Sequence, residues 1–181
     1  MEKAILGGGC FWCLEAAFSG LKGVRRVVSG YCGGHVDDPD YRAVCSGATG
    51  HVEVVEIEYD PAVVDYATLL QVFFAVHDPT TLDRQGHDVG SQYASVIFHL
   101  DEVQRETAAG TIAELEREQV FADPIVTRLA PAPRFYPAED YHQDYYRQNA
   151  QQNYCQLVIS PKLAKIRRKF SHLLQNPEAQ N

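Results

Sequence analysis

The sequence lacks any run that approaches the roughly 18 consecutive apolar residues of a membrane span, so a membrane protein is not expected. It also lacks an excess of basic residues: 16 lysines and arginines stand against 24 aspartates and glutamates, which leaves a net charge of −8. A general nucleic-acid-binding protein normally carries a basic surface, so this class is not favoured either. No secretion signal is recognised, because the apolar stretch before Cys10 is short and Glu15 interrupts it. We therefore expect a cytoplasmic protein.

The sequence has no internal repeat of about 20–50 residues and no segment with the composition of a linker. Of its 181 residues, 45% are hydrophobic and 22% are charged, which is typical of a globular chain that buries a core. Its five cysteines are an odd number and do not resemble the framework of a small disulfide-stabilised protein. These features predict a single domain over residues 1–181.

Hydrophobic periodicity and turn residues predict strands and helices that alternate along the chain. This alternation favours an α/β or α+β sandwich. The long segment 78–92 is expected to be a functional loop. We expect strands at 3–8, 24–31, 51–59, 93–100 and 125–129, and helices at 11–19, 65–77, 102–119, 138–149 and 161–174.

The strand predicted at 51–59 carries a carboxylate on its apolar side. Side chains of a strand alternate between its two faces, so Glu53 shares a face with Val55 and Ile57. Burial on such a face raises the pKa of a carboxyl group, which keeps it neutral near pH 7 and able to donate a proton. A glutamate that forms a salt bridge within the sheet is the alternative.

The segment 4–15 places a cysteine where a glycine-rich turn meets a predicted helix. Three glycines precede Cys10, and they let the backbone turn sharply and leave the sulfur accessible. The thiol would lie at the positive end of the helix dipole, which lowers its pKa and raises its thiolate fraction. Phe11 and Trp12 would line the same place with apolar surface, and Cys13 adds a second thiol. These residues indicate redox chemistry on a small apolar group.

The pair of Cys10 and Cys13, taken alone, is compatible with three kinds of site. A dithiol redox pair is favoured by its place at the start of a helix. Half of a zinc site is less expected, because Cys32 and Cys45 are too far apart in sequence to supply a second close pair. Two buried structural cysteines are the third interpretation, and the glycine-rich turn weakens it.

Several motifs, in order along residues 5–148, carry a resemblance to a known family. Gly8-Gly9-Cys10-Phe11-Trp12, followed by Glu15, resembles the active-site signature of the peptide methionine sulfoxide reductase A family. The resemblance implies a single-domain, two-layer α+β sandwich with a ferredoxin-like core and a mixed sheet. Further blocks similar to those of the family are GYCGG at 30–34, YRAVCSG at 41–47, TGHVE at 49–53, HDPT at 77–80, RQGHDVGSQY at 84–93 and AEDYHQ at 138–143.

The resemblance implies reduction of the S epimer of methionine sulfoxide, either free or within proteins. It implies that Cys10 attacks the sulfur of the sulfoxide and becomes a sulfenic acid. Glu53 is the implied acid for the sulfoxide oxygen, and Tyr41 and Tyr93 are implied to contribute hydroxyl groups. This chemistry agrees with the nucleophilic cysteine and the neutral carboxyl that the residues themselves indicate.

The resemblance also implies substrate contacts and partners. Phe11 and Trp12 match the aromatic pair that holds the methyl group of the substrate, and Asp88 matches a residue that holds a water molecule in the pocket. No metal and no organic cofactor are expected, because thioredoxin or a chemical dithiol would supply the electrons. We expect a monomer.

The recycling of the sulfenic acid departs from the common family pattern. Many members have glycine at the position of Cys13 and use cysteines in a glycine-rich C-terminal tail, which residues 149–181 do not contain. We expect Cys13 to form a disulfide with Cys10, because it lies close in sequence and on the same helical turn. Cys155, in the segment that matches the mobile tail of the family, is the other candidate. Cys45 matches a recurring cysteine and is expected to pack rather than react.

The last predicted helix, 161–174, carries a basic face opposite an apolar stripe. A solvent-exposed face is the simplest interpretation, and a docking site for an acidic reductant is the alternative. For the whole chain, a general thiol–disulfide oxidoreductase is the main competing function, because it also uses two cysteines at the start of a helix. It would not need Glu53 on an apolar face. A non-catalytic binding module or a zinc-structured module is the second competitor.

Overall fold

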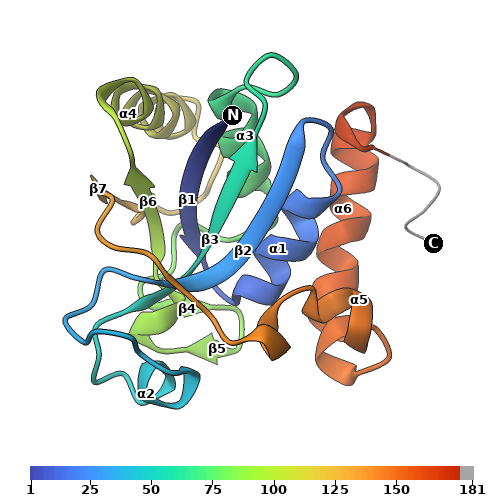
Figure 1. The fold of residues 1–181 in the computed structure, drawn as a ribbon. Coiled ribbons are helices and arrows are strands. Elements are labelled where there is room, and N and C mark those ends of the chain that lie inside the picture. Colours follow the sequence, from blue (N-terminus) through green and yellow to red (C-terminus); the bar gives the residue numbers. More distant parts are fainter. Residues whose placement is uncertain (176–181) are drawn as a thin grey trace.

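The strands β1 (Glu2–Gly8) and β3 (Val52–Tyr59) form the antiparallel centre of the sheet. Beside them lie β2 (Val24–Cys32) and β6 (Ser95–His99), with the helices α1 (Phe11–Ser19) and α3 (Tyr66–Val76) in the connections. In this computed structural model, which describes residues 1–175, the four strands follow the antiparallel order β6-β1-β3-β2 (Figure 1). Two β-α-β units in this order are the expected ferredoxin-like core. Residues 176–181 of the expected domain lie outside the described residues.

Two short strands extend this core at its edges. β7 (Arg128–Pro131) pairs parallel with β6, and β8 (Tyr136–Pro137) pairs antiparallel with β2. The six-stranded sheet is therefore mixed, as expected, and each of its edge strands ends in a proline.

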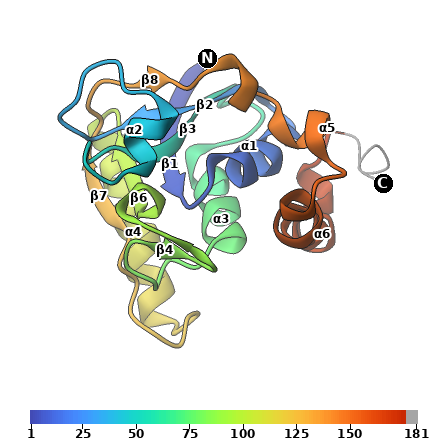
Figure 2. The same ribbon diagram turned by 90° about the horizontal axis from the view of Figure 1, so that it is seen from below.

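The helices define two layers. Figure 2 shows α1 and α3 on one face of the sheet, with α5 (Tyr145–Asn149) and α6 (Ser160–Phe170) on the outer side of α1. The 16-residue helix α4 (Glu102–Arg117) lies against β6 and β7. On the opposite face, Ala130 of β7, together with Ala132 and Phe135 of the segment that joins β7 to β8, packs against a smaller apolar cluster. Within residues 1–175, no helix combines the length and the apolar character that crossing a bilayer would require.

The alternation along β3 decides which side chains enter the main core. Val55 and Ile57 are fully buried beneath the helices, whereas Val52 and Val54 belong to the smaller cluster on the other face. The core between sheet and helices is closed by large side chains from each element, among them Leu6, Phe18, Leu69, Leu70 and Phe73.

Three helices begin at an aspartate whose side chain accepts a hydrogen bond from the backbone three residues later. Asp65 caps α3 and Asp101 caps α4, each with an N–O distance of 2.8 Å. Asp40 caps α2 (Tyr41–Cys45) in the same way at 2.7 Å. These caps satisfy donors that a helix leaves unpaired at its N-terminus. α2 lies between the strands expected at 24–31 and 51–59, where no helix was expected.

The helix expected at 138–149 is wrong in its first half. A 3₁₀ turn, η2 (Asp140–His142), is followed by Asp144 in a left-handed conformation with φ of 54°, and only then does α5 begin. The cause is a long-range contact: the Gln143 side chain accepts a hydrogen bond from the N–H of Ser29 at 3.0 Å and donates one to its carbonyl oxygen at 2.9 Å. These hydrogen bonds to β2 hold the chain at Gln143 in a conformation that is incompatible with a continuous helix.

Other expected boundaries shift for similar reasons. The strand expected at 125–129 begins later, because Val126 N–H donates to the carbonyl oxygen of Pro79 at 2.8 Å rather than to the sheet. The segment 78–92 contains a small hairpin of β4 (Arg84–Gln85) and β5 (Asp88–Val89). The last helix begins before Pro161, because a π-helical segment, η3 (Cys155–Ile159), runs directly into α6.

The close approach of two backbone segments at Gly34 gives a test of this fold. A Cβ at this position would lie 2.3 Å from the Thr49 carbonyl oxygen and 2.5 Å from the His51 nitrogen. Gly34→Ala should therefore lower the free energy of unfolding by about 2 kcal/mol or more in a urea titration. Gly110→Ala is the matched control, because none of the described residues would lie within 4 Å of a Cβ at that site on α4, and it should raise stability by about 0.5–1 kcal/mol. A Gly34→Ala variant as stable as the wild type would contradict the packing described here.

Candidate active site

Cys10 occupies the N-cap position of α1, directly after the glycine turn that ends β1. Gly9 has φ of +93°, a conformation that side chains disfavour. A Cβ at Gly9 would also come within 2.7 Å of the Gln85 side chain, so the β4–β5 hairpin packs directly against the turn. The sulfur thus lies at the start of the helix, as the sequence indicated, but only 7% of Cys10 is exposed.

The thiols of Cys10 and Cys13 form a coupled pair in the first turn of α1. A hydrogen bond from the Cys10 thiol lowers the pKa of Cys13 to about 7, whereas burial raises the pKa of Cys10 well above its usual value. The expectation that the helix end lowers the Cys10 pKa is therefore not met. Desolvation of the sulfur outweighs the helix dipole, which contributes about 0.3–1 kcal/mol at most exposed sites. The two thiols therefore shift each other's pKa in opposite directions.

Glu53 reaches the start of α1 from β3. Its Oε1 accepts a hydrogen bond from the N–H of Phe11 at 3.1 Å, while its buried Oε2 has no hydrogen-bond partner among residues 1–175. Only 1% of the residue is exposed, and burial raises the pKa of its carboxyl group to about 8. No salt bridge to Glu53 occurs within residues 1–175, so the alternative of an ion-paired glutamate is not met. A neutral carboxyl with one free oxygen is equipped to donate a proton to a bound ligand.

Tyr41 and Tyr93 approach this carboxyl group from two other elements. Tyr41 begins α2, and Tyr93 ends the 3₁₀ turn η1 (Ser91–Tyr93). Burial raises the pKa of both hydroxyl groups, and a hydrogen bond with Cys45 adds to this effect for Tyr41. Both hydroxyls are close enough to Glu53 for ionisation of its carboxyl group to raise their pKa further. The structure thus brings two protonated hydroxyls and one protonated carboxyl into the same electrostatic neighbourhood.

Trp12 is held on two sides by the segment that precedes and begins α5. Its Nε1–H donates to Nδ1 of His142 at 3.0 Å, and its ring stacks on Tyr145 with centroids 3.7 Å apart and planes inclined by 7°. Phe11 is fully buried and packs against Tyr31 and His142 at centroid distances of 5.7 and 5.1 Å. Trp12 is therefore the partly exposed member of the aromatic pair.

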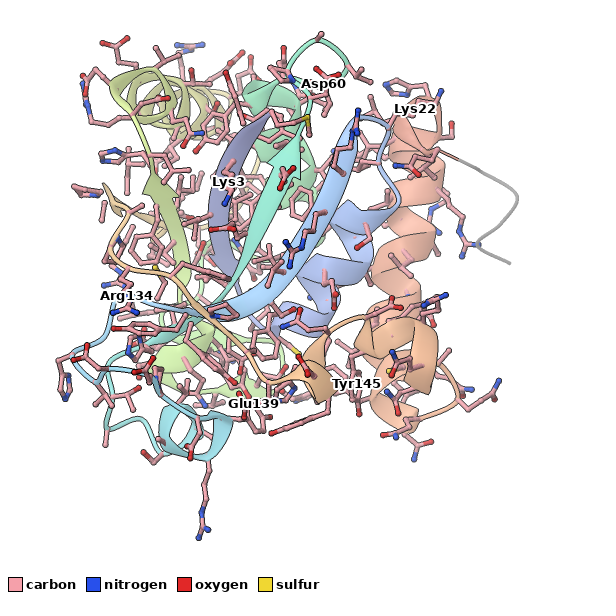
Figure 3. The ribbon with its side chains drawn as sticks, in the orientation of Figure 1. Lys3, Lys22, Asp60, Arg134, Glu139 and Tyr145 are labelled. Carbon is pink, nitrogen blue, oxygen red and sulfur yellow. The ribbon has the colours of Figure 1, made fainter. Side chains whose placement is uncertain are left out.

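Glu15 of α1 also contacts the segment that precedes α5. It is 6% exposed, and its Oε1 accepts a hydrogen bond of 2.7 Å from the N–H of Asp144, the residue in the left-handed conformation. Burial raises the pKa of Glu15 to about 7. Figure 3 shows Glu139 and Tyr145 along the same segment, which crosses from the end of β2 to α5. Sequence reasoning gave Glu15 no role beyond its place in the motif, because its partner lies 129 residues away.

Tyr154 is a site residue that the sequence analysis missed. Its hydroxyl donates to Oδ2 of Asp88 at 2.7 Å and lies 3.8 Å from the sulfur of Cys13. Its ring meets Trp12 edge to face, with centroids 5.8 Å apart and an angle of 79°. The C-terminal helical segment therefore covers the thiols, and Asp88 holds the covering residue. The one signal in the sequence was the position of Tyr154 directly before Cys155.

The other cysteines differ in their surroundings. Cys155 is fully buried in η3, and burial, followed by the charge of Cys13, raises its pKa. Cys32 is also fully buried, with its sulfur 3.5 Å from the Arg134 carbonyl oxygen, whereas Cys45 on α2 is exposed. Among residues 1–175, no group of three or more His, Cys, Asp or Glu side chains is placed to hold a metal ion.

The buried carboxyl of Glu53 should make the stability of the protein depend on pH. Its pKa of about 8 exceeds the ordinary value of 4.5, so the folded chain retains a proton that the unfolded chain releases. The resulting stability is complete below pH 4.5 and is lost as the pH rises through 8. The stability of Glu53→Gln relative to the wild type should therefore increase as the pH is raised from 5 to 9. The increase should be on the order of 1.4 kcal/mol for each unit by which the fold raises the pKa of Glu53. Urea titrations at the two pH values measure this gain.

Glu58→Gln is the control, because Glu58 lies on the opposite face of β3 and is partly exposed. It should change stability equally at pH 5 and pH 9. A pH-independent effect of Glu53→Gln would show that Glu53 is not the buried neutral acid described here.

The sequence matches a known family over nearly its whole length. The model of the family described as "Peptide methionine sulfoxide reductase" matches residues 2–174. The peptide methionine sulfoxide reductase MsrA of Chromobacterium violaceum is 81% identical over 176 residues, which cover 97% of this chain and 100% of the relative. The enzyme of the same name from Polynucleobacter asymbioticus is 53% identical, over 96% of this chain and 92% of the relative.

Solved structures of methionine sulfoxide reductases have a similar fold. Mxr1 of Saccharomyces cerevisiae in its reduced form is similar with a TM-score of 0.79 and 31% identity, covering 85% of this chain and 88% of the other. Methionine sulfoxide reductase A of Corynebacterium diphtheriae gives 0.78 and 35%, over 83% and 76% of the two chains. Mxr1 in complex with Trx2, at 23% identity and a TM-score of 0.56, shares the fold. Since the match includes the glycine turn, the strand of Glu53 and the helix that covers the thiols, the chain belongs to the peptide methionine sulfoxide reductase family.

Proposed function

We propose that this protein reduces the S epimer of methionine sulfoxide, free and within proteins, and so repairs oxidised proteins. One observation carries the proposal: the buried, neutral carboxyl of Glu53 is fixed by the residue next to Cys10. Its second oxygen is unpaired at a depth where an unpaired polar atom is costly. A sulfoxide oxygen is a strong acceptor that would satisfy this group as a donor. Membership of the family supports the same substrate.

The reaction needs a nucleophilic sulfur and a proton for the sulfoxide oxygen. The Cys10 sulfur, once its thiol proton has left, attacks the electrophilic sulfur of the substrate. Glu53 protonates the oxygen through Oε2, and the hydroxyl groups of Tyr41 and Tyr93 hold it by hydrogen bonds. The oxygen passes to Cys10. One thiol and one sulfoxide thus become one sulfenic acid and one thioether, methionine.

The resting state of the two thiols suits this sequence of steps. Cys13, whose pKa is lowered to about 7 by the hydrogen bond from Cys10, is the group that receives the proton of Cys10 when substrate arrives. The methyl group of the substrate packs against Trp12, with Phe11 behind it. Because Cys10 is almost completely buried, bulk water does not compete for its sulfur.

Cys13 is the proposed resolving thiol. Its thiol attacks the sulfenic acid, so a Cys10–Cys13 disulfide forms and the oxygen leaves as water. The mutual influence of the two sulfurs on their pKa values supports this pairing. Cys155, whose pKa responds to Cys13, is the alternative, either as a direct resolving thiol or as the next thiol in a relay.

The reductant that reopens the disulfide is proposed to be thioredoxin, with a chemical dithiol as its substitute in vitro. The crystal structure of yeast Mxr1 with Trx2 supports this for the family member concerned. No metal and no organic cofactor takes part in the proposed steps. We propose that the protein acts as a monomer in the cytoplasm, where thiols are kept reduced.

A single-turnover assay tests the function. The reduced protein, with no added thiol, should convert the S epimer of a blocked methionine sulfoxide into about one equivalent of methionine and leave the R epimer unchanged. Glu53→Gln should slow this step by about 10²-fold or more, because the proton donor is lost, whereas Glu58→Gln should not. Reduction of protein disulfides without formation of methionine would instead favour the general thiol–disulfide oxidoreductase.

Two cysteine variants test the resolving thiol. Cys13→Ser should still form one equivalent of methionine, but more slowly, because the group that receives the Cys10 proton is lost. It should also lose the disulfide and multiple turnover, whereas Cys155→Ser should retain all three. Mass mapping of the oxidised wild type should find a Cys10–Cys13 bond. A Cys10–Cys155 bond would contradict the assignment while leaving the reductase step in place.

A further inference from the structure

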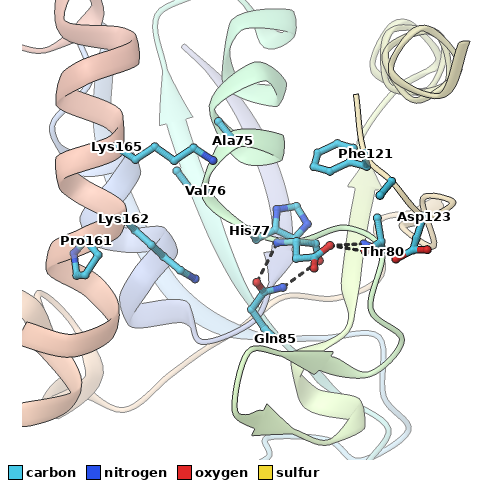
Figure 4. Close-up of a pocket in the computed structure, with 12 residues that line it drawn as sticks. Ala75, Val76, His77, Thr80, Gln85, Phe121, Asp123, Pro161, Lys162 and Lys165 are labelled. Carbon is cyan, nitrogen blue, oxygen red and sulfur yellow. Dashed lines mark hydrogen bonds between the residues drawn. The ribbon is translucent and has the colours of Figure 1, made fainter. Parts of the chain in front are cut away.

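A groove leads away from the catalytic thiols along α6. One cavity, of about 600 Å³, begins at Asp88 and Tyr154 and continues past Leu157. A second, of about 510 Å³, lies between α6, the end of α3, the β4–β5 hairpin and the segment that follows α4 (Figure 4). Gln85, Pro161 and Lys162 line both cavities, so the two form one continuous depression, which we call the α6 groove.

The two halves of the α6 groove differ in character. Near the thiols, Leu157, Val158 and Pro161 line the groove, and Leu157 is 76% exposed, so one wall of this end is apolar. Large exposed apolar side chains at the mouth of a site are typical of a surface that contacts another molecule. A substrate larger than free methionine sulfoxide would cover them.

The far half of the groove presents positive charge from one wall. Lys162 and Lys165 extend from α6 into the cavity (Figure 4), and neither takes part in a salt bridge within residues 1–175. The acidic residues of this cavity lie on the opposite wall, and Asp78 there already accepts two hydrogen bonds from Thr80. In a chain of net charge −8, two unpaired ammonium groups facing a cavity favour a negatively charged occupant.

The helix itself sets the reach of this groove. Residues 153–170 form one continuous helical run, so Lys165 lies eleven residues beyond Tyr154. At a rise of about 1.5 Å per residue, this places it about 16 Å along the axis from the covering tyrosine. An extended peptide advances about 3.3–3.6 Å per residue, so about five residues span the same length.

We propose that the α6 groove binds the polypeptide that flanks an oxidised methionine. Lys162 and Lys165 select acidic side chains about four to five residues from the methionine sulfoxide. This inference rests on the proposed function and deepens it: the preferred protein substrates carry aspartate or glutamate at that spacing. The apolar half of the groove holds the intervening residues.

The test compares peptides of eleven residues with blocked ends and methionine-S-sulfoxide at the centre. One pair carries two aspartates or two asparagines at the fourth and fifth positions before the sulfoxide, and a second pair carries them after it. With dithiothreitol as the reductant, the aspartate peptide of one pair should have a kcat/KM about fivefold higher than its asparagine partner. The difference should lie in KM and should shrink at about 0.5 M salt.

Lys165→Glu should remove this preference, and Lys165→Gln should reduce it by an intermediate amount. Lys165 is the residue to change, because the charge of Lys162 adds to the hydrogen bond from Cys10 in lowering the pKa of Cys13. Arg168→Glu is the matched control: it makes the same change of net charge on the same helix, at an exposed residue that lines neither cavity. It should keep the preference.

Each variant is also assayed with blocked methionine sulfoxide, which is too short to reach Lys165. Failure of the wild type on this small substrate would overturn the proposed function, whereas normal turnover with equal rates on aspartate and asparagine peptides would overturn only the groove assignment. If Lys165→Glu and Arg168→Glu lost the preference for aspartate peptides equally, the preference would depend on net charge alone, and the groove assignment would also be overturned. A loss seen only when thioredoxin replaces dithiothreitol would overturn it in favour of a docking site for the reductant.

Discussion

The hydrogen bond from Phe11 N–H to Glu53 Oε1 connects the two halves of the catalytic unit. It joins the start of α1, where the cysteine lies, to the third strand of the core, where the acid lies. The register of the sheet fixes its geometry, because β3 is paired with β1 on one side and with β2 on the other. A slip of one residue in β3 would turn Glu53 to the opposite face and place an apolar side chain beside the sulfur.

The same physical cause acts on every titratable group near this bond. Removal from water raises the pKa of Glu53, of Glu15 and of the Cys10 thiol, although the three serve different purposes. For Glu53 it yields an acid that is still protonated at neutral pH. For Cys10 it suppresses the thiolate until a substrate and a neighbouring base are present, which also protects the sulfur from adventitious oxidation.

The parts of the site that depend on local sequence could be predicted, and the parts that depend on distant partners could not. Periodicity placed Glu53 on the correct face, and the run of glycines before Cys10 placed the sulfur at the start of a helix whose bounds match the prediction. The raised pKa of Cys10 was missed, because it follows from burial of the side chain in the folded protein, which the local motif does not reveal. The break before α5 was missed for the same reason, since Gln143 binds β2 across 114 residues.

The prolines that end β7 and β8 limit the addition of strands from other proteins to the edges of the sheet. Each stands on an outer strand of the sheet and lacks the N–H group that a further strand would need. Oxidised proteins partly unfold and expose their own unpaired strands. Such strands can add to an open sheet edge, and a repair enzyme with open edges would aggregate with its substrates in this way. The prolines at the edge strands disfavour this pairing and leave the active site accessible.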